Sequence, residues 1–298
     1  MRVFVTGGSG FIGSAVIPEL LGAGHRVLAL ARSDRSAETL RAAGAEVHRG
    51  SLDDPEDLAR AAAGTDGVVH LAFNHDTFPD MTRAVATDLA VIEAIGVALA
   101  GSDRPFVVTS GTMMLASVDG VATEADTPVP GTYRSAPDLA ALALAGRGVR
   151  SAVVRLAPTV HGRGDQGFVP RLVDVARGKG VAAYIGDGTN RWPAVHRLDA
   201  ARLFRLALES APAGTGLHAA ADEGIPFKDI AAAIGRGLDV PVKSIPAEEA
   251  QAHFGWLGLP ASIDNATSSE RTRNLLGWKP EQPGLIADLE DGFYFSAP

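Results

Sequence analysis

Near the start of the chain, Gly7, Gly10 and Gly13 are spaced three residues apart within Thr6-Gly7-Gly8-Ser9-Gly10-Phe11-Ile12-Gly13. A short apolar strand is expected over residues 3–5 and a helix over residues 11–21, so the glycines occupy the turn between them. One glycine can form the tight turn, one can admit a phosphate close to the backbone, and one can let helix and strand pack closely. The free N–H groups at the helix start would then bind a pyrophosphate. The spacing therefore predicts a dinucleotide-binding loop.

The first half of the chain alternates between short apolar runs and helical patterns. Strands are expected at residues 27–31, 46–48, 68–71, 106–109 and 152–156, and helices at residues 37–43, 55–63, 81–100 and 136–145. Apolar strands separated by helices indicate a parallel sheet that is covered on both faces. The expected fold class is therefore α/β, with a doubly wound parallel-sheet Rossmann domain.

After about residue 163, glycine, proline and tryptophan become more frequent, which indicates a smaller mixed lobe. Helices are expected at residues 169–176, 200–208, 227–235 and 285–291, and a late strand at residues 217–220. We therefore expect a nucleotide-binding domain over residues 1–165 and a C-terminal substrate-binding lobe over residues 166–298. This boundary is soft, because one or two segments around residues 191–220 could return to the sheet.

The composition argues against several classes of protein. Of the 298 residues 46% are hydrophobic, which allows a large core, and the net charge of −8 argues against sequence-independent nucleic-acid binding. No cysteine is present, so disulfides and thiolate metal sites are excluded, and a reducing cytoplasm is the expected location. No apolar run approaches the roughly 18 residues of a membrane-spanning helix. We expect a cytoplasmic protein that acts on a small molecule.

The end of the second strand indicates which dinucleotide the loop would bind. Sites that prefer NAD usually place Asp or Glu there, where the carboxylate bonds the ribose 2′-hydroxyl. Here the strand ends in Ala31-Arg32-Ser33, with Arg35 nearby. A guanidinium pairs well with the 2′-phosphate of NADP, whereas a carboxylate would repel it. The sequence therefore favours NADP, with NAD as the alternative.

Several later motifs follow the glycine loop in a characteristic order. They are Gly50-Ser51-Leu52-Asp53, Val69-His70-Leu71-Ala72, Phe106-Val107-Val108-Thr109-Ser110, Arg155-Leu156-Ala157-Pro158-Thr159-Val160-His161-Gly162 and Val195-His196-Arg197-Leu198-Asp199-Ala200-Ala201. Over about two thirds of the chain, these motifs resemble the extended branch of the short-chain dehydrogenase/reductase superfamily. The resemblance implies that Ser51 and Leu52 lie by the adenine and that Leu71, Ala72 and Phe73 lie along the cofactor. It also implies a monomer or a homodimer. The family usually has an acid where Ser51 stands.

The catalytic dyad of that family, Tyr-x-x-x-Lys, is missing. Its tyrosine donates a proton as hydride arrives, and its lysine brings the pKa of the tyrosine toward working pH. The residues four places after Tyr133, Tyr184 and Tyr294 are Pro137, Gly188 and Pro298, and no lysine occurs before Lys179. Ser135 is expected to cap a helix with Pro137 and Asp138 in its first turn, which places Tyr133 before the helix. An intact loop without the dyad resembles the atypical subgroup of the family.

Four residues could replace the dyad: Ser110, Tyr133, His161 and His196. A histidine can donate a proton near neutral pH without a lysine, and His161 follows a strand whose end faces the cleft. His196 precedes Asp199, the expected cap of the helix over residues 200–208. The expected substrate contacts are Thr112, Arg191 and Trp192. The arginine could clamp an anion, and the tryptophan could stack on a planar substrate or fill the joint between the lobes. No metal site is expected.

Three functions fit these features. The first is an NADP-dependent reductase of the atypical subgroup, which reduces a carbonyl or activated double bond of a small organic substrate with a proton donor other than Tyr/Lys. The second is a non-catalytic NADP(H)-binding redox sensor, which the loss of the dyad favours. The third is an epimerase, dehydratase or isomerase of the type that acts on sugar nucleotides.

Overall fold

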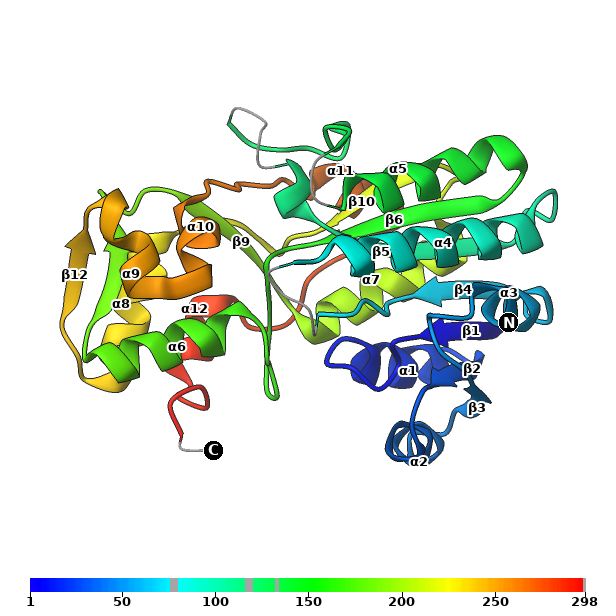
Figure 1. Cartoon of the computed structure of the whole chain (residues 1–298), viewed down its shortest axis with the longest axis horizontal. Helices are drawn as coiled ribbons and strands as arrows, with labels where there is room; N and C mark the ends of the chain where they lie inside the picture. The colour runs from blue at the N-terminus through cyan, green and yellow to red at the C-terminus, as the bar shows by residue number, and fades with distance from the viewer. Residues whose placement is uncertain (76–79, 116–119, 132–133, 297–298) are drawn as a thin grey trace.

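The computed structural model describes residues 1–75, 80–115, 120–131 and 134–296. Figure 1 shows two parts: a large sheet with helices on both sides, which contains the N-terminus, and a smaller lobe at the left of the view. Within the described ranges, every helix is too short or too polar to cross a membrane.

The large sheet contains seven parallel strands in the order β10-β6-β5-β4-β1-β2-β3. They are β1 (Arg2–Thr6), β2 (Arg26–Ala31), β3 (Glu46–Arg49), β4 (Gly67–His70), β5 (Pro105–Gly111), β6 (Arg150–Leu156) and β10 (Thr215–Ala219). The predicted doubly wound parallel sheet is confirmed. The strand order reverses between β1 and β4, and open α/β sheets bind ligands outside the carboxyl ends of the strands at such a point.

Helices cover both faces of this sheet because successive strand residues point to opposite sides. Val3 and Val5 belong to one apolar core, and Phe4 between them belongs to a second core on the other face. The first face is covered by α1 (Gly13–Gly22), α2 (Asp34–Ala42) and α7 (Arg197–Ser210), and the second by α3 (Pro55–Ala63), α4 (Thr82–Leu99) and α5 (Ser135–Ala143). Burial of each large apolar side chain contributes about 1.5–3 kcal/mol.

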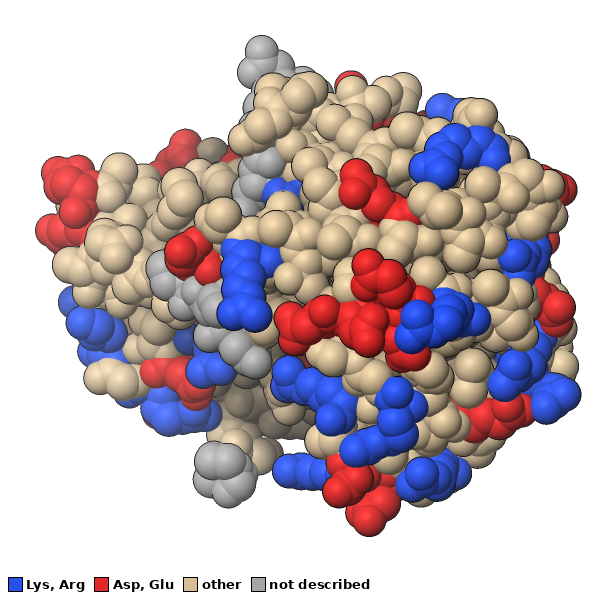
Figure 2. All heavy atoms as spheres, turned by 45° about the vertical axis from the view of Figure 1, so that its right-hand side comes forward, with Lys and Arg blue, Asp and Glu red and all other residues tan. Residues whose placement is uncertain are grey.

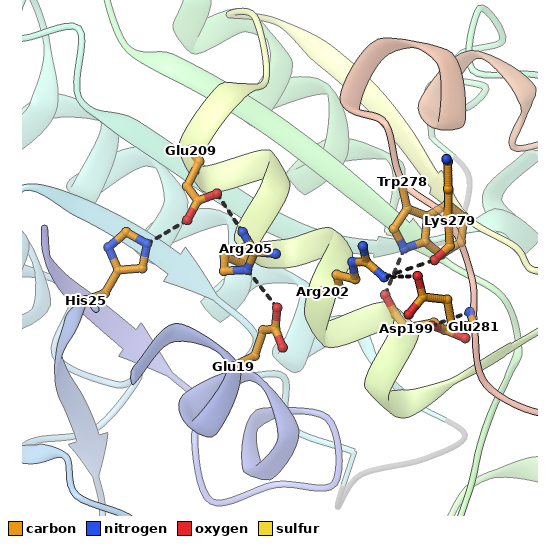
Figure 3. A network of polar contacts seen from close by, with 9 residues as sticks. All are labelled: Glu19, His25, Asp199, Arg202, Arg205, Glu209, Trp278, Lys279 and Glu281. Atoms are coloured by element: carbon orange, nitrogen blue, oxygen red, sulfur yellow. Dashed lines mark hydrogen bonds and ion pairs between the residues drawn. The ribbon is translucent and has the colours of Figure 1, made fainter. Parts of the chain in front are cut away.

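Helix α7 and strand β10 return to the large sheet after part of the small lobe has been formed. The Arg205 guanidinium of α7 bonds Glu19 of α1 at 2.7 Å and Glu209 at 2.8 Å, as Figure 3 shows. At the start of the same helix, the Trp278 indole N–H donates to the Asp199 carbonyl oxygen at 3.0 Å. The helix that follows the glycine loop is therefore braced by residues from late in the chain.

The start of α7 differs from the sequence expectation. The helix begins at Arg197, and His196 caps it because its Nδ1 accepts the Leu198 N–H at 3.2 Å. The expected cap, Asp199, accepts two backbone N–H groups of residues 281–282 instead, at 2.9 and 3.0 Å. The prediction that Asp199 caps the helix is thus wrong, because the carboxylate has partners that lie far away in the sequence.

Helix α5 begins at Ser135 and has Asp138 in its first turn, yet Ser135 is not its cap. Arg134 occupies the cap position, with a φ of 55° and no side-chain cap bond. This left-handed conformation costs about 1–3 kcal/mol for a residue other than glycine, so the surrounding contacts must hold it.

The small lobe contains two further sheets. One consists of β7 (Thr159–His161), β9 (Arg191–His196) and β11 (Asp222–Pro226), and the other of β8 (Ala182–Ile185) and β12 (Val242–Ile245). Around them lie α6 (Phe168–Lys179), α8 (Phe227–Leu238), α9 (Ala250–Phe254), α10 (Gly258–Ser262) and α12 (Leu285–Glu290), while α11 (Glu270–Leu276) packs near β10. The core of the lobe contains a cluster of aromatic rings: the Trp192 ring lies 5.6 Å from Phe168 and 5.0 Å from Phe227 between centroids.

Candidate active site

The glycine loop forms a tight connection between β1 and α1. Gly7 has a φ of 71°, and a Cβ there would lie 2.7 Å from the backbone nitrogen of Ala72. A Cβ on Gly13 would overlap the carbonyl oxygen of Gly7. The backbone N–H groups of Phe11 and Ile12 find no acceptor among the described residues. A helix start with free N–H groups and such close backbone packing suits the pyrophosphate of a dinucleotide.

The residues after β2 form a basic corner. Arg32 and Ser33 are exposed, and the Ser33 hydroxyl accepts the Ser36 N–H at 3.2 Å, which caps α2. The nearest acid, Asp34, pairs with Arg49 at 2.9 Å. The carboxylate that could repel a ribose phosphate here is therefore balanced by an arginine.

The other expected cofactor contacts follow β3 and β4. The Ser51 hydroxyl donates to Oδ2 of Asp53 at 3.1 Å, and Leu52 packs on the core of the α3 and α4 face. Leu71 packs on the opposite core. Because the carboxyl ends of parallel strands share one edge, these residues lie on the same edge of the sheet as the glycine loop.

A buried chain of polar contacts joins the end of β1 to α4. The Thr6 hydroxyl accepts the Ala72 N–H at 3.2 Å and lies 2.7 Å from Nδ1 of His70. On the other side of the ring, Nε2 of His70 lies 2.9 Å from Oδ1 of Asp88, and both residues are 2% exposed. A carboxylate only accepts, so we assign the hydrogen to Nε2, and Nδ1 then accepts the proton of the Thr6 hydroxyl.

Arg134 extends this chain from the start of α5. Its Nη2 donates to Oδ2 of Asp88 at 3.1 Å and to the Thr109 carbonyl oxygen at 3.3 Å. Its guanidinium carbon lies 3.7 Å from the ring centroid of Phe73, a cation–π distance. The side chain is only 13% exposed. A cation is thus held over Phe73, a residue expected along the cofactor.

Sequence reasoning missed both members of the Asp88–Arg134 pair, although one left a signal. The buried face of α4 repeats through residues 84, 88, 91, 92 and 95, so a charged residue occupies an apolar face. A charge in such a position is rarely buried without a partner. Arg134 carries no such signal, because its backbone conformation and its partner depend on tertiary contacts.

The end of β5 lies beside this network. Ser110 is 5% exposed, and its hydroxyl, like that of Thr109, has no partner among the described residues. Thr112 is fully buried, and its hydroxyl donates to Oδ1 of Asn265 at 2.8 Å while its carbonyl accepts the Asn265 amide at 3.0 Å. The contacts of Thr112 therefore tie the chain near residue 265 to β5. Tyr133 lies outside the described residues.

His161 and His196 occupy matching positions on the paired strands β7 and β9, with ring centroids 5.4 Å apart. His161 is fully buried, its Nδ1 lies 2.6 Å from Oδ2 of Asp288, and its Nε2 has no partner among the described residues. Burial lowers the pKa of His161, although Asp288 opposes this effect. Burial and the neighbouring His161 lower the pKa of His196, which is partly exposed. Both rings are therefore mainly neutral at pH 7.

A carboxyl group with a raised pKa lies close to this pair. The Tyr294 hydroxyl donates to Oδ2 of Asp165 at 2.8 Å and accepts the Gly162 N–H at 3.2 Å. Burial raises the pKa of Asp165 to about 6, against the hydrogen bonds that its carboxylate accepts from the Gly167 N–H and the Tyr294 hydroxyl. Burial also raises the pKa of Tyr294, so this hydroxyl is a poor source of protons.

Arg191 and Trp192, two expected substrate contacts, are engaged within the small lobe. Arg191 forms a two-pronged ion pair with Asp264, with Nη2–Oδ2 at 2.7 Å and Nε–Oδ1 at 3.0 Å. Trp192 is fully buried in the aromatic core of the lobe, where it fills space rather than facing solvent. A pocket of about 280 Å³ lies nearby, with Asp187 and Asp264 in its lining. The glycine loop does not line it.

Arg197 brings the start of α7 to the glycine loop. Its guanidinium carbon lies 5.3 Å from the ring centroid of Phe11. Sequence reasoning missed this residue, although its neighbour His196 was a candidate. The contact places the two histidines of β7 and β9 on the part of the molecule that adjoins the loop.

Charges of both signs are interspersed on the face of the molecule that Figure 2 shows. The described residues contain no group of three or more His, Asp or Glu side chains arranged to hold a metal ion.

Comparisons with known proteins agree with this architecture. The model of the NAD dependent epimerase/dehydratase family matches residues 3–218. An uncharacterised protein of Schizosaccharomyces pombe is 50% identical over 99% of this chain and 100% of its own length. One of Saccharomyces cerevisiae is 44% identical over 98% and 99%. The structure of DesIV, a dTDP-glucose 4,6-dehydratase from Streptomyces venezuelae with NAD and TYD bound, has a TM-score of 0.77 at 21% identity, over 97% of this chain and 96% of that one.

The family match extends from β1 into β10 and so includes the glycine loop and the whole of the large sheet. Its enzymes use a nicotinamide dinucleotide, and the loop described above suits that cofactor. We therefore assign this protein as an NAD(P)-dependent enzyme of the oxidoreductase type. The chain belongs to the NAD dependent epimerase/dehydratase family.

Proposed function

We propose that this protein is an NADP(H)-dependent reductase that acts on the carbonyl or activated double bond of a small organic substrate. The observation that carries the proposal is the combination of a complete glycine loop with a basic corner after β2. Arg32 follows the strand directly, and the acid Asp34 is balanced by Arg49. A ribose 2′-phosphate would therefore meet cations rather than a free carboxylate.

Reduction of a carbonyl requires a proton as well as a hydride. The reduced nicotinamide supplies the hydride when it is bound. We assign the hydrogen bond that polarises the carbonyl to His196, whose ring is partly exposed and is oriented by the Leu198 N–H on Nδ1. The Nε2–H of its neutral ring would donate a hydrogen bond to the substrate oxygen as that oxygen gains the electron pair of the C=O bond, and solvent would supply the proton. His161, which is held by its contact with Asp288, would pack against the His196 ring and fix the orientation of that ring.

The choice of NADP is tested by removal of Arg32. We expect Arg32→Ala to weaken NADPH binding by about 10- to 100-fold and to leave NADH binding unchanged, because a charge-assisted hydrogen bond contributes about 1.5–3 kcal/mol. Arg26→Ala is the matched control: this exposed arginine stands at the opposite end of β2, about 20 Å away. Titration calorimetry with both cofactors measures the effect. Equal losses for NADPH and NADH in the Arg32 variant would show that NADP is the wrong assignment.

Turnover is tested by following NADPH absorbance in the presence of ketones, quinones and enones. Consumption with at least one class supports the reductase. Tight NADPH binding with no consumption would instead support a non-catalytic NADP(H) sensor, which the missing Tyr-x-x-x-Lys dyad favours. An epimerase or dehydratase returns its cofactor to the starting oxidation state. Conversion of dTDP-glucose without net consumption of cofactor would therefore support that third function.

A further inference from the structure

Arg134 is held at the carboxyl edge of the large sheet by three different contacts. Its guanidinium bonds Asp88 of α4 and the Thr109 carbonyl of β5, and it stacks on Phe73 beyond the end of β4. Its backbone adopts the left-handed conformation with a φ of 55°. Such strain persists only where neighbouring structure enforces it, and it is concentrated at functional sites. The start of α5 thus fixes a cation next to the point where the strand order reverses.

The hydrogen-bond donors of Arg134 are only partly used. Nη2 serves both Asp88 and Thr109, while Nε is buried without a partner among the described residues. No described residue accepts from Nη1, and 13% of the side chain is exposed. An unsatisfied donor beside a ligand site is costly unless a ligand or water completes it.

The engaged Nη2 also limits what this guanidinium can bind. Both edges that can grip a carboxylate with two parallel hydrogen bonds include Nη2, and Asp88 already occupies that group. A single acceptor oxygen on Nη1 does not meet this obstacle.

We propose that Arg134 binds the reacting oxygen of the substrate through Nη1, and that its pairing with Asp88 selects ketones and enones over carboxylates. This proposal rests on the reductase function and names the class of substrate for the same site. Arg134 stabilises the negative charge that develops on the oxygen and keeps its own protons, because a guanidinium is not deprotonated in proteins. The proton that the oxygen needs comes from solvent.

The first experiment separates substrate binding from charge balance. Arg134→Gln alone leaves Asp88 buried without its cation, so both stability and activity should fall. The double variant Arg134→Gln/Asp88→Asn removes both charges and should recover most of the stability. Its kcat/KM on the best ketone should nevertheless stay about 100-fold below that of the wild type, the usual loss when one oxyanion donor is removed. Arg236→Gln, on the exposed surface of α8, is the control for loss of a positive charge.

The second experiment does not depend on turnover. The protein saturated with NADP⁺ is titrated with 4-nitrophenol, whose phenolate presents one anionic oxygen, and separately with 4-nitrobenzoate, which presents a carboxylate. We expect the phenolate to bind at least about tenfold more tightly to the wild type than to the double variant, which corresponds to about 1.4 kcal/mol. The benzoate should show no such dependence on Arg134.

Three outcomes would overturn the proposal: full recovery of kcat/KM in the double variant, equal binding of the phenolate by wild type and double variant, or benzoate binding that depends on Arg134. The reductase function can fail on its own. If no compound consumes NADPH while phenolate binding still depends on Arg134, the oxygen site stands and the reaction assigned to it is wrong.

Discussion

The described part of the chain contains two buried histidine–aspartate pairs, and their remaining polar atoms are hydrogen-bonded in different ways. In the pair of His70 and Asp88, both imidazole nitrogens have partners, and Arg134 bonds the second carboxylate oxygen. In the pair of His161 and Asp288, Nε2 of the histidine has no partner among the described residues, and the His196 ring stands beside it. In the first pair every polar atom of the imidazole is hydrogen-bonded, which ties β4 to α4, whereas the second pair contains a buried ring nitrogen without a hydrogen bond to the described residues. Both histidines bond an aspartate, so the pairs differ in the other imidazole nitrogen: that of His70 is hydrogen-bonded, and that of His161 is not, within the described ranges.

The largest difference is expected when the two aspartates are removed. Asp88→Ala should lower the free energy of unfolding by about 3–5 kcal/mol, because it leaves the cation of Arg134 and a His70 donor buried without their acceptor. Asp288→Ala should cost only about 1–3 kcal/mol, because the neutral His161 loses one hydrogen bond. Urea unfolding of both variants measures the contrast. Equal losses of unfolding free energy would mean that the two pairs contribute equally to stability.

The next largest effect concerns catalysis at His196. Asparagine is a good helix cap, so His196→Asn should keep α7 stable while kcat falls about 100-fold, the lower range for loss of a hydrogen-bond donor to the substrate oxygen. His196→Ala should show the same fall in kcat and a further loss of stability of about 1 kcal/mol. Steady-state rates and urea unfolding separate the two effects. A wild-type kcat in the His196→Asn variant would mean that His196 only caps α7 and takes no part in catalysis.

A smaller effect is expected in the pH dependence of stability. The pKa of His161 is lowered in the folded protein, so the unfolded chain takes up this proton first as pH falls below 6.5. The contribution of His161 to stability is thus complete above pH 6.5 and decreases as pH falls toward the lowered folded pKa. His161→Gln should flatten the fall in unfolding free energy as the pH decreases below about 6.5. An unchanged slope would count against a buried neutral imidazole.

The smallest effect on stability is expected at Asp165, and its pH dependence is opposite in sign to that of His161. Its pKa is raised from 3.8 to about 6 on folding, so stability is lost as pH rises through this window. Asp165→Asn should therefore be more stable than the wild type at neutral pH, by under about 1 kcal/mol because the charge-assisted bonds from Tyr294 and Gly167 are weakened. Unfolding at pH 4.5 and at pH 7.5 tests the sign. A variant less stable at both pH values would contradict it.

The sheet and the glycine loop were predictable because their signals are local. The spacing from Gly7 to Gly13 and the apolar runs of β1 to β6 specify a strand, a turn and a helix without reference to distant residues. The strand β9 was missed because it contains Pro193, and proline usually marks a loop. The site itself depends on long-range partners: Arg134 and Asp88 are 46 residues apart, and His161 and Asp288 are 127 apart. No periodicity connects residues at such separations.

The late return of α7 and β10 has a consequence for synthesis of the chain. The sheet lacks its seventh strand until residue 219 has left the ribosome, although its first six strands are complete by residue 156. Until then β6 presents an unpaired edge, and the apolar face that α7 covers, beside α1, is open to other chains. We expect a fragment ending near residue 165 to aggregate, and a nascent chain to need protection over this interval. The nucleotide loop is made first, yet the helix that follows it gains its packing partner, α7, only when the chain returns to the sheet.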